Sequence, residues 1–180
     1  MINDKLKKAR EYEVRKEKEI APDKRPAFHL TPRVGWMNDP NGFSYHNGEY
    51  HLFYQYHPYD TNWGPMHWGH AVSKDLLKWE NRPTALAPDE RYDDFGCFSG
   101  SATTLDDGRQ ILMYTGVETA KDEEGKEIVF QTQCIAVGDG TNFEKYEKNP
   151  VITADDLPEG ASKIDFRDPK IWKEKDGTFR

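Results

Sequence analysis

Two aspartates in similar local settings are the candidates for catalysis. Asp39 lies within the stretch WMNDPNG at residues 36–42, and Asp168 lies within FRDPK at residues 166–170. Proline fixes its own φ and biases the preceding residue toward an extended conformation, so each carboxylate is carried on stiffened backbone. A glycosidase requires two carboxyl groups close to the bond that it cleaves. Because an Asp-Pro pair also occurs in ordinary turns, a purely structural role for each aspartate is the alternative interpretation.

The residues around Asp39 suit a sugar-binding site. Trp36 supplies an indole ring that can stack on the C–H face of a sugar, while the carboxylate can accept hydrogen bonds from sugar hydroxyls. Asn41 and Gly42 favour a tight turn, because glycine adopts left-handed backbone at little cost. The competing interpretation is a capped turn that leads into a strand. A short motif does not by itself decide between the two.

The overall composition argues against several classes of protein. The 180 residues carry a formal net charge of -7, and no basic patch alternates with aromatics beyond the extreme N-terminus, which disfavours a nucleic-acid partner. Apolar runs are only a few residues long, so no segment is expected to span a membrane. No apolar signal-peptide core follows Met1, which predicts a cytoplasmic protein. Cys97 and Cys134 are too few for a disulfide scaffold and are predicted to be buried thiols.

Residues 1–25 are predicted to form a charged helix and a linker. The helix is expected to run from Asp4, as its N-cap, to about Ile20, with Lys and Glu alternating on most of its surface. Its apolar stripe is thin and consists of Leu6, Ala9, Tyr12 and Val14. We therefore expect a largely solvated helix at the edge of the main domain, which covers residues 26–180.

From residue 28 onward the pattern changes to strands separated by turn dipeptides. Hairpins are indicated by Asn-Gly or Asp-Gly pairs between apolar runs, with their glycines at Gly48, Gly108 and Gly177. Aligning these glycines gives a unit of four strands over roughly sixty to seventy residues, which is typical of propeller blades. The predicted blades cover residues 28–83, residues 95–150 and, incompletely, the residues from 164 onward. A propeller closes with about four to eight blades, so we expect the chain to be an N-terminal portion of a longer protein, or else a truncated protein.

The same alignment assigns the candidate residues to a common position in the repeat. It places Asp39, Ser99 and Asp168 at one equivalent position, the start of the first strand of a blade. That position faces the central channel of a propeller, so the three side chains are expected to converge on one pocket. Arg167 is expected to keep the neighbouring Asp168 ionised, a state better suited to holding sugar hydroxyls than to donating a proton.

Several motifs in order resemble those of glycoside hydrolase family 32, the β-fructosidases. Residues 36–42 resemble the family's signature, and residues 97–102 (CFSGSA) and 166–170 resemble its next two motifs. Residues 51–58 and 63–70 are similar to the bacterial sucrose-6-phosphate hydrolases, or invertases, of that family. The likeness covers the chain from the first predicted blade onward. The agreement of several ordered motifs makes it highly specific.

The resemblance implies an all-β chain that forms the first two and a half blades of a five-bladed propeller, which a β-sandwich follows in the family. It implies retaining cleavage of terminal non-reducing β-D-fructofuranosides, with sucrose, sucrose 6-phosphate or short fructans as substrates. Asp39 matches the nucleophile, which forms a covalent fructosyl-enzyme, and Asp168 matches the transition-state stabiliser. Substrate-binding positions are matched by Trp36, Met37, Asn38, Gln55, Trp63, Phe98, Ser99 and Arg167. Neither a metal nor an organic cofactor is implied.

The acid/base glutamate of the family lies in a Glu-Cys motif beyond the position of Asp168, and no residue of this chain stands in such a motif. The resemblance therefore implies that the 180 residues alone lack the proton donor and have little or no hydrolase activity. The alternative is a non-catalytic, truncated propeller fragment that only binds fructosides. The preference among sucrose, its 6-phosphate and fructans stays open, because the basic residues of the glucosyl subsite cannot be placed.

Two other polar groups are expected to be structural. His67 and His70 lack a third ligand at zinc-like spacing, which disfavours a metal site. A solvated rim, with a role at the substrate entrance as the alternative, is expected before the second blade from Asp89, Asp93 and Asp94.

Overall fold

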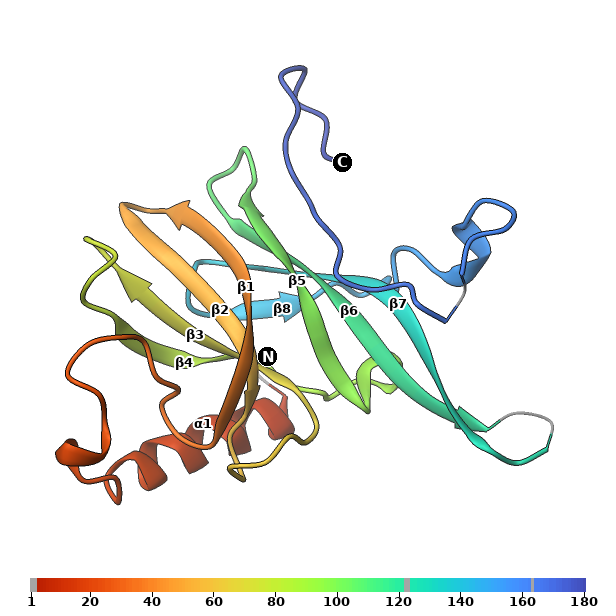
Figure 1. Ribbon diagram of the computed structural model, residues 1–180. Helices are drawn as coiled ribbons and strands as arrows, with labels where there is room; N and C mark the ends of the chain where they lie inside the picture. Colours follow the sequence, from red (N-terminus) through yellow and green to blue (C-terminus); the bar gives the residue numbers. More distant parts are fainter. Residues whose placement is uncertain (1–2, 122–123, 163) are drawn as a thin grey trace.

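The strands of the protein form two four-stranded antiparallel sheets that lie side by side (Figure 1). The computed structural model describes residues 3–121, 124–162 and 164–180. The first sheet, blade 1, consists in order of β1 (Trp36–His46), β2 (Glu49–His57), β3 (His67–Ser73) and β4 (Glu80–Leu86). The second, blade 2, consists of β5 (Gly96–Thr104), β6 (Gln110–Lys121), β7 (Glu127–Gly138) and β8 (Phe143–Lys145). The prediction of two successive four-stranded blades is confirmed.

The blades pack against each other along their innermost strands, β1 and β5 (Figure 1). Phe53 and Trp68 of blade 1 share one buried apolar core with Tyr114 of blade 2. The indole Nε1–H of Trp68 also donates to the carbonyl oxygen of Phe98 at 3.0 Å, across the boundary between the blades. This shared core holds the first strands of the two blades in place, and those strands carry Asp39 and Ser99.

The predicted hairpin turns are present. The turn glycines Gly48, Gly108 and Gly177 have φ angles of 83°, 83° and 89°, a left-handed conformation that glycine adopts without a Cβ penalty. Beyond blade 2, after the short 3-10 helix η3 (Ala154–Asp156), two backbone hydrogen bonds of 2.9 and 3.0 Å join Trp172 and Arg180. The chain therefore begins a third hairpin where the repeat predicted one.

The N-terminal helix differs from the prediction at both ends. Helix α1 (Asp4–Glu17) begins at Asp4, and the residue that caps it is Asn3, whose side chain accepts a hydrogen bond from the backbone N–H of Lys5 at 3.1 Å. It ends before Ile20, because the chain turns there toward the 3-10 helix η1 (Pro22–Lys24). Val14, assigned to the apolar stripe, is 45% exposed.

A buried carboxylate docks this helix on blade 1. Glu13 is 1% exposed and accepts hydrogen bonds from the backbone N–H and the hydroxyl of Thr84, at 3.1 and 2.7 Å. The Tyr56 hydroxyl donates to it at 3.4 Å, and the Arg33 guanidinium lies 3.5 Å away. Burial raises the pKa of Glu13, and the hydrogen bonds from Thr84 oppose that effect. Hydrogen bonds and an ion pair to one buried side chain, in addition to the thin apolar stripe, therefore fix the helix.

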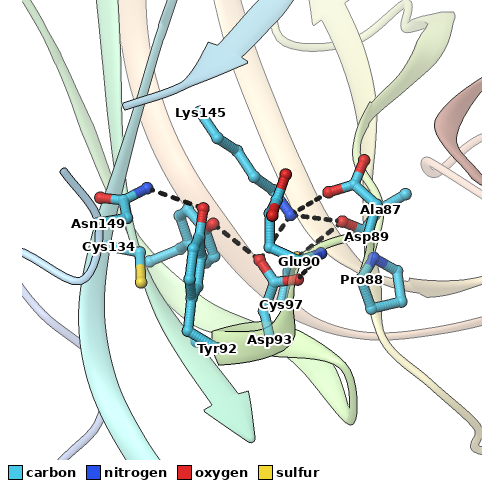
Figure 2. A network of polar contacts seen from close by, with 12 residues as sticks. Ala87, Pro88, Asp89, Glu90, Tyr92, Asp93, Cys97, Cys134, Lys145 and Asn149 are labelled. Carbon is cyan, nitrogen blue, oxygen red and sulfur yellow. Dashed lines mark hydrogen bonds and ion pairs between the residues drawn. The ribbon is translucent and has the colours of Figure 1, made fainter. Parts of the chain in front are cut away.

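A second buried charged group joins the two blades (Figure 2). Lys145 of β8 donates through Nζ to the carbonyl oxygen of Ala87 at 2.8 Å, to Asp93 at 2.5 Å and to Asp89. Asp93 ends the 3-10 helix η2 (Arg91–Asp93) and accepts a hydrogen bond from the Tyr114 hydroxyl at 2.9 Å. We call Lys145, Asp89 and Asp93 the interblade ion cluster.

The interblade ion cluster corrects the prediction of a solvated acidic rim. The side chains of Asp89 and Asp93 are 6% and 0% exposed, because β8 lays Lys145 over them. Only Asp94 stays exposed, and it accepts a hydrogen bond from the backbone N–H of Thr119 at 2.9 Å. Cys97 and Cys134 are free and buried, as predicted.

His67, at the start of β3, links the stability of the protein to pH. It is 3% exposed, and its Nδ1 lies 2.9 Å from the carbonyl oxygen of Pro65. Burial lowers the pKa of His67 from an ordinary value of 6.5 to about 3. The unfolded chain therefore binds a proton that the folded protein does not. The stability contributed by the neutral ring is fully present above about pH 6.5 and is lost as the pH falls toward 3.

Replacing His67 with Gln should remove this dependence. Between about pH 7.5 and about pH 5, we expect the free energy of unfolding of the wild type to fall by about 2 kcal/mol more than that of His67→Gln. Urea denaturation at a series of pH values measures both curves, which should run parallel above pH ~7.5, where both states carry a neutral ring. Parallel curves down to pH ~5 would contradict a neutral His67 in the folded state.

Candidate active site

Asp39 lies in β1, where the strand departs from regular pairing with β2. The register between the two strands shifts between Met37 and Pro40 and again between Asn41 and Ser44. Bulges of this kind bend a strand and redirect its side chains, and they are common beside active sites. Asp39 therefore sits on a stretch of strand whose geometry differs from that of a regular ladder, and its side chain is exposed.

Gly42 makes the second irregularity possible. Its φ is +52°, and an added Cβ would lie 2.8 Å from the Phe53 ring and 3.2 Å from the Cβ of Ala102. Both the backbone conformation and the packing therefore require glycine. The prediction of a tight turn at Asn41 and Gly42 is wrong, because both residues lie inside β1 and the chain turns only at Gly48.

The candidate nucleophile is held from the neighbouring blade. Ser99 of β5 donates a hydrogen bond through Oγ to Oδ2 of Asp39, with a distance of 2.9 Å. The two residues are sixty positions apart in sequence and belong to the innermost strands of different blades. The blade repeat placed them at equivalent positions, and the packing of β1 on β5 brings these two of the three predicted residues into contact.

Asp168 is connected to this pair through the backbone. Its N–H donates to the Thr115 hydroxyl at 2.9 Å, and that hydroxyl lies 3.3 Å from the carbonyl oxygen of Ser99. Its φ is +63°, so the extended conformation predicted from the following proline is wrong. Aspartate is one of the few residue types that tolerate left-handed backbone, and such strain is concentrated at functional sites.

Arg167 has a different partner from the one predicted. Its guanidinium forms an ion pair of 2.7 Å with Asp165, two residues back along the chain. The hydrogen bond to Asp165 raises the pKa of Arg167, with a smaller contribution from the charge of Asp168. The predicted effect of Arg167 on the neighbouring carboxylate of Asp168 stays a prediction.

The other residues of blade 1 assigned to substrate binding differ in environment. Trp36 donates through its indole N–H to the side-chain oxygen of Asn38 at 2.9 Å, which holds the ring next to the exposed Asn38. Met37 packs against the apolar core of blade 1 and is only partly exposed. Gln55 is 3% exposed, and its amide donates to the carbonyl oxygen of Cys97 at 3.0 Å, so it also ties blade 1 to blade 2.

Aromatic rings form a wall next to Ser99. Trp63 is 48% exposed and meets the ring of Phe98 edge to face, with a centroid distance of 6.2 Å. Its other neighbour is Phe95, at 5.6 Å. Exposed rings of this kind offer apolar faces to the C–H groups of a sugar while the carboxylates accept hydrogen bonds from its hydroxyls.

Sequence reasoning missed the polar side chains behind Asp168. They are Ser101 of β5, Thr115 of β6, and Gln131 and Gln133 of β7, all buried. A sequence signal exists only for the glutamines, which alternate on one face of a strand whose opposite face is partly apolar. Their partners are backbone groups distant in sequence, which no local pattern reveals.

No group of three or more metal-ligating side chains is placed to hold a metal ion among the residues that the structure describes. In the same part of the chain, no helix has the length and apolar character needed to cross a membrane.

Two four-stranded antiparallel blades whose inner strands carry the exposed Asp39 and its partner Ser99, beside aromatic rings, are the arrangement expected of a propeller glycosidase. The sequence model of the glycosyl hydrolases family 32 N-terminal domain matches residues 29–180, and the chain belongs to this family.

Characterised relatives and solved structures agree with this assignment. The chain is 50% identical over 155 residues to raffinose invertase from Escherichia coli, an alignment that covers 86% of this chain and 31% of the relative. It is 44% identical over 170 residues to sucrose-6-phosphate hydrolase from Bacillus subtilis, covering 93% of this chain and 33% of that protein. The structure of the Bombyx mori β-fructofuranosidase BmSUC1 superposes with a TM-score of 0.81 at 49% identity, over 95% of this chain and 34% of that one. The chain thus spans about a third of the length of these relatives.

Proposed function

We propose that this chain supplies the nucleophile and the transition-state stabiliser of a retaining β-fructofuranosidase. The proposed substrates are terminal non-reducing β-D-fructofuranosides, with sucrose and sucrose 6-phosphate as the first candidates. The observation that carries the proposal is the 2.9 Å hydrogen bond between Ser99 and Asp39, because it joins two motifs of the family across two blades. Solved complexes of relatives support a sugar substrate: BmSUC1 is known with sucrose, and the fructan 1-exohydrolase of Cichorium intybus with 1-kestose.

In this proposal Asp39 attacks the anomeric carbon of the fructosyl unit. The bond from that carbon to the oxygen of the leaving sugar breaks, and a covalent fructosyl-enzyme forms. Water then attacks the same carbon, fructose leaves, and the Asp39 carboxylate is restored. The hydrogen bond from Ser99 supports this role because it orients one oxygen of the Asp39 carboxylate.

Asp168 is proposed to stabilise the transition state. Its carboxylate is exposed, so it can accept hydrogen bonds from fructose hydroxyls, and it favours the positive charge that develops on the sugar ring. Trp36, Trp63 and Phe98 would contact the apolar faces of the sugar. Asn38 and Arg167, both exposed, would donate hydrogen bonds to its hydroxyls.

The proton donor for the leaving sugar is proposed to come from outside these 180 residues. Departure of the glucosyl oxygen requires a carboxylic acid on the opposite side of the scissile bond from the nucleophile. The family's Glu-Cys motif would supply it, and no glutamate of this chain precedes a cysteine. We call the chain continued through the rest of the family's catalytic domain the full-length protein.

The 180-residue chain alone is expected to hydrolyse sucrose at a rate indistinguishable from the buffer blank, because general acid catalysis contributes about 10²–10⁴-fold and the rest of the propeller channel would also be missing. The full-length protein should turn over sucrose or sucrose 6-phosphate. Release of glucose or glucose 6-phosphate from mass-verified samples measures both rates.

The comparison also decides between the two functions under consideration. Ready hydrolysis by the 180-residue chain would contradict the assignment of the proton donor. If the full-length protein binds fructosides but hydrolyses none of sucrose, its 6-phosphate and 1-kestose, the proposal of an enzyme fails, and a fructoside-binding fragment is the better description.

A further inference from the structure

The backbone that carries Asp168 is held by side chains rather than by a regular strand. We call residues 166–171 the Asp168 segment; no strand or helix includes them. Backbone groups without ladder partners must find other hydrogen bonds. In the Asp168 segment these partners are hydroxyl and amide groups of blade 2, namely those of Ser101, Thr115, Gln131 and Gln133.

The four side chains form hydrogen bonds along the length of the Asp168 segment. Gln131 accepts from the N–H of Phe166 at 3.1 Å, and Gln133 donates to the carbonyl oxygen of the same residue at 2.8 Å. At the other end, the Ser101 hydroxyl donates to Pro169 and accepts from the N–H of Ile171, both at 2.8 Å. These contacts fix both sides of Asp168, whose own N–H bonds to Thr115.

Thr115 stands at the centre of this arrangement. It is fully buried, and its hydroxyl oxygen accepts the N–H of Asp168 at 2.9 Å. Its single proton has two acceptors within reach, the carbonyl oxygen of Ser99 at 3.3 Å and the side-chain oxygen of Gln133 at 3.2 Å. One hydroxyl therefore touches the backbone of the residue that binds Asp39 and the backbone of Asp168.

The conformation of Asp168 explains why such support is needed. A φ of +63° is uncommon for any residue other than glycine, and a following proline disfavours many backbone conformations further. Strained conformations of this kind persist only where the surroundings over-determine them. The N–H of Asp168 donates to the buried Thr115 hydroxyl, whose own proton has acceptors within reach. This hydrogen bond is the contact that acts directly on the strained residue.

We propose that Thr115, oriented by Gln133, is a positioning residue that sets the Asp168 carboxylate relative to the Asp39 carboxylate. Neither Thr115 nor Gln133 contacts the substrate in this proposal. Their effect on catalysis therefore operates through the geometry of Asp168. This inference rests on the proposed role of Asp168 in stabilising the transition state. It therefore requires that loss of the Thr115 hydroxyl affect kcat more than KM.

Thr115→Val and Thr115→Ser in the full-length protein test the proposal, since valine keeps the shape without the hydroxyl and serine keeps the hydroxyl. Misplacement of a catalytic group by about 1 Å can cost about 100-fold, so Thr115→Val should lower kcat by about 10- to 100-fold with KM changed less than about threefold. Thr115→Ser should retain most of the wild-type kcat. The matched control is Thr132→Val on β7, whose hydroxyl faces Gly116 instead of the Asp168 segment, and which should leave kcat unchanged.

Hydrogen exchange in the 180-residue chain provides a second readout that does not depend on activity. The Asp168 amide should be protected in the wild type and in Thr115→Ser, and should exchange at least about tenfold faster in Thr115→Val, while amides in the middle of β6 stay protected. If Thr115→Val cannot be purified in folded form, Gln133→Leu removes the neighbouring amide and should give the same pattern of exchange and kcat.

An unchanged kcat in Thr115→Val, or an equal loss in Thr115→Ser or Thr132→Val, would overturn the proposal. Unchanged exchange of the Asp168 amide would overturn it as well. Failure of the proposed function would give a different result. In that case Asp168→Asn would leave turnover intact, and the rate of hydrogen exchange at the Asp168 amide in the Thr115 variants would not affect this conclusion.

Discussion

Asp39→Asn should abolish hydrolysis of sucrose by the full-length protein. The amide cannot act as the nucleophile that forms a fructosyl-enzyme, and replacing nucleophiles in other hydrolases lowers kcat by a factor on the order of 10⁴ to 10⁶. The fold should hardly change, because asparagine has nearly the same shape and its side-chain oxygen can still accept the hydrogen bond from Ser99. Steady-state kinetics and a urea unfolding curve of the same sample measure the two effects.

The matched control for this substitution is Asp23→Asn in η1, an exposed position outside the site. It should keep wild-type kinetics, since surface substitutions away from a functional feature change stability by less than about 0.5 kcal/mol. Activity within tenfold of the wild type in Asp39→Asn would exclude Asp39 as the nucleophile. A large loss of stability in that variant would show that its carboxylate is structural.

Lys145→Met should destabilise the 180-residue chain by about 3–5 kcal/mol. Removing one member of a buried ion cluster leaves the carboxylates of Asp89 and Asp93 without a counter-charge, and that loss is larger than the net value of the pair itself. Burial opposes the charge of Lys145, yet the attraction of the two carboxylates raises its pKa above the usual value. The cluster joins β8 of blade 2 to the segment between the blades (Figure 2). The loss of stability should therefore appear as cooperative unfolding in which blade 2 comes away from blade 1.

Lys148→Met, three residues further on and exposed, is the control and should change the free energy of unfolding by less than about 0.5 kcal/mol. Combining Lys145→Met with Asp93→Asn should recover part of the loss, because the second change removes one of the uncompensated charges. Urea denaturation of the four proteins provides the measurement. A loss below about 1 kcal/mol in Lys145→Met would mean that water enters the cluster and screens it.

Local signals account for the success of the blade prediction. Alternating apolar runs and the glycines at positions 48, 108 and 177 act within a few residues, so hairpins could be located directly in the sequence. The repeat of those hairpins then brought Asp39 and Ser99 to equivalent strand starts, and they are in contact. The roles of these residues in catalysis depend on the family resemblance and stay predictions.

The wrong predictions of solvent exposure have a cause that is not local. Glu13 was assigned to a solvated helix and is buried against Thr84, while Asp93 was assigned to a solvated rim and lies under Lys145. In each case a charged residue is buried because a partner more than fifty positions away binds it: the Thr84 hydroxyl donates a hydrogen bond to Glu13, and Lys145 pairs with Asp93. Sequence periodicity treats charged residues as exposed and carries no information about such partners.

The bulge at Gly42 and the left-handed backbone of Asp168 also depend on contacts between residues distant in sequence. The sequence predicted left-handed backbone at residues 41–42 and extended backbone at Asp168, because glycine tolerates the first and a following proline favours the second. Which unusual conformation each adopts depends on packing: the Phe53 ring leaves no room for a side chain at Gly42, and the Thr115 hydroxyl holds the N–H of Asp168.

The turns and the order of the strands were thus readable from the chain, because each depends on interactions among near neighbours. The repeat also predicted that Asp39, Ser99 and Asp168 converge, but not the hydrogen bond between Asp39 and Ser99 or the support of Asp168 by Thr115 and Gln133. These contacts form where the two blades pack through a common core, and contacts between distant segments follow from the shape of both surfaces together.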